Sequence, residues 1–170
     1  KSKILNCSLY DALLNDYEDD LHSDKIDKIF NQLTSFLPIF LKEVLNFQKK
    51  NKKIIHIKDK VRIKLQEKLG RLLMQKIGFN FLYGRLDVSM HPFCGGAYKD
   101  SRITTRYNEK NFIESLMGVL HETGHALYNL GLPDKWKYQP VGAALGTVVH
   151  ESQSLFMEMQ ICRSYEFLKF

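Results

Sequence analysis

Hydrophobic residues recur at helical spacing along most of the first 78 residues. Two helices are predicted in the first fifty residues, the second of them starting at Ser23 and Asp24 and crossing Pro38, where we expect a kink. A further helix is predicted from about Asp59 to Gly78, the glycine serving as its left-handed stop. The apolar stripes of these helices are expected to face a core.

The pattern changes between residues 79 and 110. Glycine and proline interrupt it at Gly84, Pro92, Gly95 and Gly96. The segment Arg102–Tyr107 is rich in β-branched residues, so it predicts a strand within a short hairpin or small sheet between Phe81 and Tyr107.

Helical spacing returns after residue 110. Asn111 is expected to cap a helix, with Glu114 as its capping-box partner, and the helix is expected to end at Gly131. A last helix is predicted from about Leu145 to beyond Tyr165. The sequence thus predicts a mainly α fold with a small hairpin or sheet. We divide residues 1–170 into a helical part (1–78), a loop-and-strand part (79–110) and a final helical part (111–170).

Composition is that of a globular protein, with 44% hydrophobic and 26% charged residues among 170. No apolar run approaches the roughly 18 residues of a membrane helix, so no membrane partner is expected. Three separated cysteines, Cys7, Cys94 and Cys162, favour a reducing compartment. The chain lacks an initiator Met and ends inside a predicted helix, so we expect a fragment of a longer protein.

A net charge of +6 is concentrated partly in the lysine cluster of residues 49–53. Such a cluster can bind nucleic acid. However, no nucleic-acid-binding motif accompanies it, and aromatic residues do not alternate with the lysines as base stacking would require. A solvated helix end or loop is the favoured interpretation, with no nucleic-acid partner.

The segment His121-Glu122-Thr123-Gly124-His125 matches HExxH and lies inside a predicted helix. Residues four apart on a helix differ by about 40° in azimuth and about 6 Å along the axis, so both imidazoles can reach one metal ion. Glu122 is displaced by about 100° from His121 and is expected to act as general base on a zinc-activated water. Two surface histidines beside a solvated glutamate are the alternative.

A catalytic zinc site needs a third protein ligand, and His2Glu is a known set. Glu151 in the last predicted helix is the candidate. Glu158, seven residues later, is expected on the same face, either hydrogen-bonded to a ligating histidine or as a surface carboxylate. His150 is a poor ligand candidate, and a supporting role near the site and simple packing in the helix stay equally open.

The ordered motifs His91-Pro92-Phe93, Asp100-Ser101-Arg102-Ile103-Thr104, HETGHALY and HESQS together resemble the thermostable carboxypeptidase family, typified by carboxypeptidase Taq. The resemblance implies a helical metallopeptidase fold with a small sheet beside the HExxH helix. It implies a homodimeric, cytoplasmic metallocarboxypeptidase that uses zinc, or sometimes cobalt, to remove C-terminal residues from peptide substrates.

Residue by residue, the resemblance implies that His121, His125 and Glu151 are the metal ligands and Glu122 is the general base. It implies that His91 lines the groove and that Asp100, Arg102 and Thr104 position substrate. The family's later motifs are absent, so we expect this chain to carry the metal centre without the full substrate pocket. The alternative is a non-catalytic zinc-binding helical module or one part of a split enzyme. The sequence does not indicate which C-terminal residue is preferred.

Overall fold

The computed structural model describes residues 1–51, 57 and 59–170. These form two compact units, Lys1–Ile57 and Lys58–Phe170. The expected boundaries near residues 78 and 110 stay a prediction. None of the helices in the described residues is long and apolar enough to cross a membrane.

The described residues of the first unit form three helices where two were expected. They are α1 (Ser2–Leu5), α2 (Leu9–Leu14) and α3 (Ser23–Asn51). The side chain of Ser8 caps α2 by accepting a hydrogen bond from the Asp11 amide at 3.0 Å. The carboxylate of Asp11 in turn accepts from the Ser23 amide at 2.8 Å, which ties α2 to the start of α3.

Helix α3 corrects the expectation that its apolar stripe faces a core. None of its residues is buried, because no other element described in the first unit packs along it. The helix also continues through Pro38 without ending there. Lys52 and Lys53 of the lysine cluster lie outside the described residues.

The second unit contains a three-stranded sheet in the order β1-β3-β2. Strand β1 (Gly84–Val88) pairs in parallel with β3 (Asp100–Thr105), and β2 (Phe93–Ala97) pairs with β3 in the antiparallel direction. The predicted small sheet is confirmed, although β3 begins two residues before the expected Arg102. A short 3-10 turn, Phe81–Tyr83, leads into β1.

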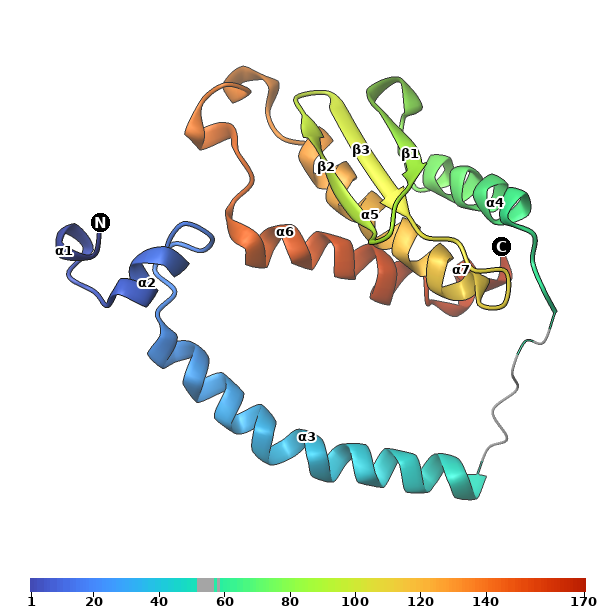
Figure 1. Ribbon diagram of the computed structural model, residues 1–170, viewed down its shortest axis with the longest axis horizontal. Coiled ribbons are helices and arrows are strands. Elements are labelled where there is room, and N and C mark those ends of the chain that lie inside the picture. The colour runs from blue at the N-terminus through green and yellow to red at the C-terminus, as the bar shows by residue number, and fades with distance from the viewer. Residues whose placement is uncertain (52–56, 58) are drawn as a thin grey trace. The chain divides into compact units, whose positions relative to one another are not determined.

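Helices α4 (Ile63–Lys76) and α5 (Phe112–Leu130) pack together, and α5 runs along one face of the sheet (Figure 1). Gly78 follows α4 with φ of +106°, so the predicted left-handed stop is confirmed. Asn111 precedes α5 as expected, but the capping box does not form. Its side-chain NH₂ donates to the Glu114 carboxylate at 3.0 Å, and its side-chain oxygen accepts no hydrogen bond from a helix amide.

Two cores flank α5. The first joins it to α4 and the sheet, and the second joins it to α4 and the C-terminal segment. The buried members of the first are Met74, Phe79, Leu86, Ile103, Val119 and Ala126, and those of the second are Leu73, Leu120 and Cys162. The expected fold class, mainly α with a small sheet beside the HExxH helix, is therefore confirmed.

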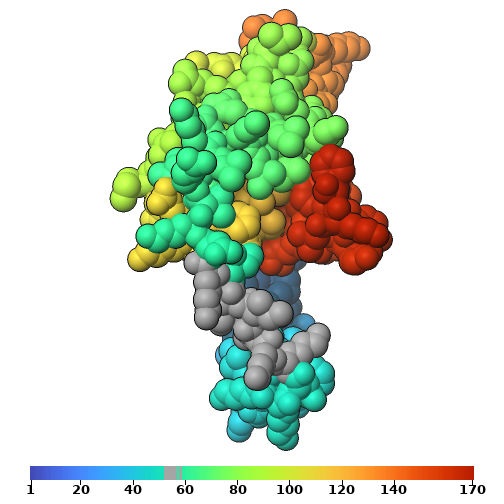
Figure 2. Space-filling view, turned by 90° about the vertical axis from the view of Figure 1, so that its right-hand side faces the viewer, coloured from blue at the N-terminus to red at the C-terminus, as the bar shows by residue number. Residues whose placement is uncertain are grey.

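After α5 the chain makes two 3-10 turns, Asp134–Trp136 and Pro140–Gly142, and enters α6 (Gly146–Leu155). The predicted single helix to beyond Tyr165 is wrong. It changes to a π-helix at Phe156–Ile161, and a new short helix, α7 (Tyr165–Lys169), starts after Ser164. The Ser164 side chain accepts from the Phe167 amide at 3.2 Å and so caps α7. Figure 2 shows this C-terminal segment, in red, lying against the green and yellow residues of α4 and α5.

Candidate metal centre

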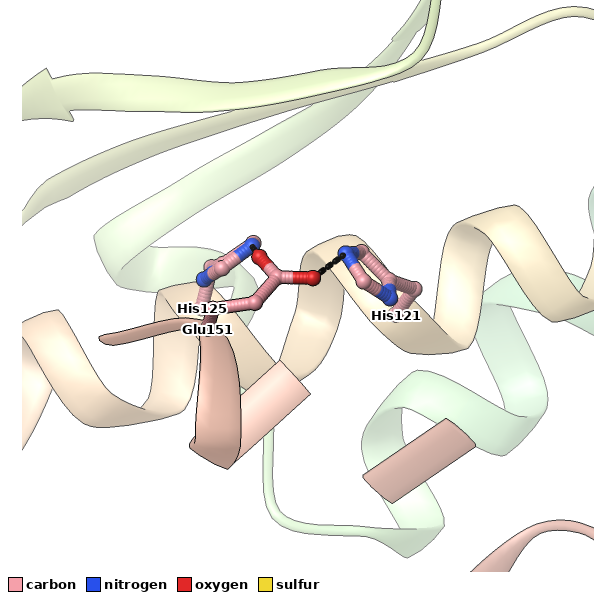
Figure 3. Close-up of side chains that lie close together, drawn as sticks. All are labelled: His121, His125 and Glu151. Carbon is pink, nitrogen blue, oxygen red and sulfur yellow. Dashed lines mark ion pairs between the residues drawn. The ribbon is translucent and has the colours of Figure 1, made fainter. Parts of the chain in front are cut away.

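Helices α5 and α6 bring together two imidazoles and one carboxylate. His121 and His125 lie one turn apart on α5, and Glu151 reaches between their rings from α6 (Figure 3). One Glu151 oxygen is 3.6 Å from Nε2 of His121, and the other is 3.3 Å from Nε2 of His125. One ligand atom from each residue lies within 4.8 Å of the other two.

This donor set fits a divalent cation. Two imidazole nitrogens and one carboxylate are the protein ligands of a common type of catalytic zinc site, which leaves a fourth position open. The Glu151 side chain is 51% exposed, whereas those of His121 and His125 are 21% and 11% exposed. The three donors therefore converge from the protein side and leave an accessible side.

His121 is oriented from behind by a carboxylate. Its Nδ1 lies 3.1 Å from Oε2 of Glu158, so the ring donates there and presents Nε2 toward Glu151. Arg163 forms an ion pair with the other Glu158 oxygen. Glu158 sits in the π-helix, and Arg163 follows five residues later, just beyond the end of that helix.

His125 has a different support. Its ring stacks on that of His150, with centroids 4.3 Å apart and an interplanar angle of 14°. Nε2 of His150 donates to Oδ1 of Asn129 at 3.1 Å, and Tyr128 meets the His150 ring edge-on. Nδ1 of His125 is buried without a hydrogen-bond partner in the part of the chain described. Burial, then His150 and His121, lower the pKa of His125, which favours the neutral ring that a cation requires.

Glu122 lies beneath the sheet on the same helix. It is buried, and this burial raises the pKa of its carboxyl group, with a further contribution from Glu151. The pKa of Glu122 is lowered, to a smaller extent, by His121, by His91 and by the backbone amide of Cys94 in β2. A carboxylate with a raised pKa is a better proton acceptor near neutral pH. Burial also raises the pKa of the neighbouring Cys94 thiol to about 11, so this thiol stays protonated.

The loop that contains His91 is held by Thr104. The Thr104 hydroxyl oxygen accepts from the Phe93 amide at 3.2 Å and lies 2.6 Å from the hydroxyl of Ser89. His91 itself is exposed. Asp100 and Arg102, which the family resemblance also assigns to substrate, bond each other at 2.9 Å with exposed side chains.

A cavity of about 690 Å³ opens beside His125 and Glu151. His125, His150 and Glu151 contribute to its wall, and Val148 and Leu155 of α6 make part of it apolar.

The sequence matches the model of the carboxypeptidase Taq (M32) metallopeptidase family over residues 2–170. The chain belongs to this family. Membership implies a metal cofactor, and the His121, His125 and Glu151 cluster is a candidate site for it.

The M32 relatives include thermostable carboxypeptidase 1 from Pyrococcus furiosus, 36% identical over 94% of this chain and 32% of the relative. Thermostable carboxypeptidase 1 from Thermus thermophilus is 37% identical over 94% of this chain and 31% of the relative. The solved structure of Trypanosoma cruzi metallocarboxypeptidase 1 superposes with a TM-score of 0.88 at 46% identity, covering 95% of this chain and 32% of that one. The predicted M32-type fold is thus confirmed, and the chain spans about a third of the length of these relatives.

Sequence reasoning did not identify Asn129 or Arg163 as parts of this M32 site. Asn129 lies four residues after His125, and this helical spacing is a signal that would have placed it beside the second histidine. Arg163 gave no such signal, because its contact with Glu158 spans the end of a π-helix that the apolar pattern does not reveal.

Proposed function

We propose that this chain carries the metal centre of a metallocarboxypeptidase that removes C-terminal residues from peptides. The observation that carries the proposal is the convergence of His121, His125 and Glu151, whose ligand atoms lie within 4.8 Å of one another. The names of the M32 relatives support the reaction class.

His121 and His125 would hold the cation through Nε2, and Glu151 through its carboxylate. A cation bound there would lower the pKa of the attacking water and polarise the scissile carbonyl. Zinc is the proposed metal because it favours this donor set, with cobalt as a substitute.

Glu122 would take the proton of the attacking water and return it to the leaving amine. Its raised pKa supports this role, because the carboxylate then accepts a proton more readily near neutral pH. The cavity beside Glu151 is large enough for a residue of the peptide.

The substrate-positioning roles of His91, Asp100, Arg102 and Thr104 remain part of the proposal. The interaction of His91 with Glu122 supports a position near the reacting groups, and Thr104 would act by holding the His91 loop. Asp100 and Arg102 would offer charged groups on the exposed part of β3.

A cytoplasmic location is proposed because the three cysteines Cys7, Cys94 and Cys162 are free thiols, which persist in a reducing compartment. The proposed homodimer rests on the family resemblance alone.

The test compares Glu122→Gln with the wild type in the intact protein. The substrate is a peptide with a free C-terminus, and the same peptide with an amidated C-terminus is the specificity control. We expect Glu122→Gln to lower kcat by about 10²- to 10⁴-fold, because general-base catalysis contributes that much, and to leave metal content unchanged.

Glu114→Gln is the matched control, since Glu114 is an exposed glutamate of the same helix. Wild-type activity in Glu122→Gln would overturn the general-base role. A wild-type protein that binds zinc but cleaves neither peptide would instead support the non-catalytic zinc-binding module.

A further inference from the structure

The backbones of α5 and α6 are in direct contact at Gly124. A Cβ atom built there would lie 2.7 Å from Cα of Ser154 and 2.8 Å from the carbonyl oxygen of Gln153. It would also lie 3.2 Å from Cβ of Met157. The two nearest atoms belong to the backbone of α6, so no side-chain rotation can make room for the added Cβ.

Glycine is otherwise unfavourable at this position. Gly124 is buried in the interior of α5, where alanine is intrinsically a better helix former. A glycine inside a helix indicates a packing or functional reason, and here the reason is the direct contact of two helix backbones.

This contact lies beside the three metal-site residues. Gly124 directly precedes His125 and follows His121 by three residues, and its contact residue Ser154 follows Glu151 by three. The Ser154 hydroxyl donates to the Glu151 carbonyl at 2.7 Å, which couples the contact to the backbone of Glu151. The separation of the helices at Gly124 therefore sets how far the Glu151 carboxylate lies from the two imidazoles.

We propose that Gly124 is a positioning residue for the metal centre, which holds α6 close enough for Glu151 to act as the third ligand. This inference rests on the proposed metal site. An alanine would displace α6 by several tenths of an ångström. Metal–ligand distances tolerate only about 0.2 Å, so the contribution of Glu151 to binding would be lost.

Gly118 provides a matched control on the same helix. A Cβ built at Gly118 would lie 3.7 Å from Cγ of Pro92, which is an ordinary contact. Gly118→Ala therefore makes the same chemical change in α5 without moving α6.

The experiment measures Co²⁺ affinity and the visible absorption spectrum of the Co²⁺-loaded intact protein. The variants are Gly124→Ala, Gly118→Ala, Glu151→Gln and the double variant of Gly124→Ala with Glu151→Gln. The spectrum reports coordination geometry directly, so it detects loss of a ligand independently of catalysis.

We expect Gly124→Ala to weaken Co²⁺ binding by about tenfold or more and to change the spectrum toward that of Glu151→Gln. In the Glu151→Gln background, Gly124→Ala is expected to weaken Co²⁺ binding by less than about twofold, because the effects of residues that act through one another are not additive. The Co²⁺ affinity of Gly118→Ala should stay within about twofold of the wild-type value, because the Cβ added at Gly118 lies beside Pro92 and not against α6.

Additive effects of Gly124→Ala and Glu151→Gln would overturn the proposal, as would a wild-type spectrum in Gly124→Ala. Loss of the helical circular dichroism of metal-free Gly124→Ala would also overturn it, because the glycine would then serve folding as a whole. If Glu151→Gln alone binds Co²⁺ like the wild type, it is the proposed metal site that fails.

Discussion

The two imidazoles of the candidate metal centre lie one turn apart on α5 but are supported in opposite ways. On the His121 side, the Glu158 carboxylate holds Nδ1 at 3.1 Å and Arg163 pairs with that carboxylate. On the His125 side, the flat ring of His150 stacks at 4.3 Å, and Nδ1 has no hydrogen-bond partner within the described residues. One ring is thus held by charge and the other by packing.

The difference teaches how such a site can be perturbed selectively. A carboxylate behind a ligating histidine fixes its tautomer and raises its basicity. A stacked ring restrains orientation but adds little charge. Changes on the His121 side should therefore affect cation affinity more strongly than changes on the His125 side.

The largest effect in this comparison is expected from Glu158→Ala. Loss of the carboxylate frees the tautomer of His121 and leaves Arg163 unpaired, so zinc affinity should fall about 10- to 100-fold. Competition with a chromophoric chelator measures the affinity. Glu166→Ala, which removes an exposed glutamate from the same C-terminal segment, is the control. Equal affinities of Glu158→Ala and Glu166→Ala would show that the charge behind His121 has no role in binding.

A smaller effect is expected from His150→Ala, which removes the ring stacked on His125. Aromatic pairs contribute about 0.5–1.5 kcal/mol, which corresponds to an affinity loss of about two- to tenfold. His150→Phe keeps a flat ring and loses only the hydrogen bond to Asn129, so its metal affinity should stay closer to that of the wild type. The same chelator competition ranks the three proteins. The stacking account fails if Phe and Ala at this position weaken binding equally.

The proximity of His121, His125 and Glu151 was largely predictable because it depends on helical geometry. The four-residue spacing of His121 and His125 places both rings on one face whatever surrounds the helix. The carboxylate of Glu151 was predicted from its place in the next helix and from the need for a third ligand. Glu158 was expected on the face of Glu151 and contacts His121, but the π-helix that contains it was not predicted.

The parts that sequence reasoning missed depend on tertiary contacts. The stripe of α3 has the same apolar periodicity as a core helix, yet none of its residues is buried. Periodicity reports which face is apolar and does not report what covers it. Likewise, Asn111 and Glu114 fit a capping box, but their side chains bond each other instead.

The central claim is that the Glu151 carboxylate of α6 is the third protein ligand of one divalent cation, beside His121 and His125. The most direct measurement is the metal content of the purified intact protein and of Glu151→Ala, by elemental mass spectrometry after dialysis against metal-free buffer. The account predicts about one zinc ion per wild-type chain and loss of most of it in Glu151→Ala, because two imidazoles alone do not make such a site. Equal metal content in the two dialysed proteins would contradict it.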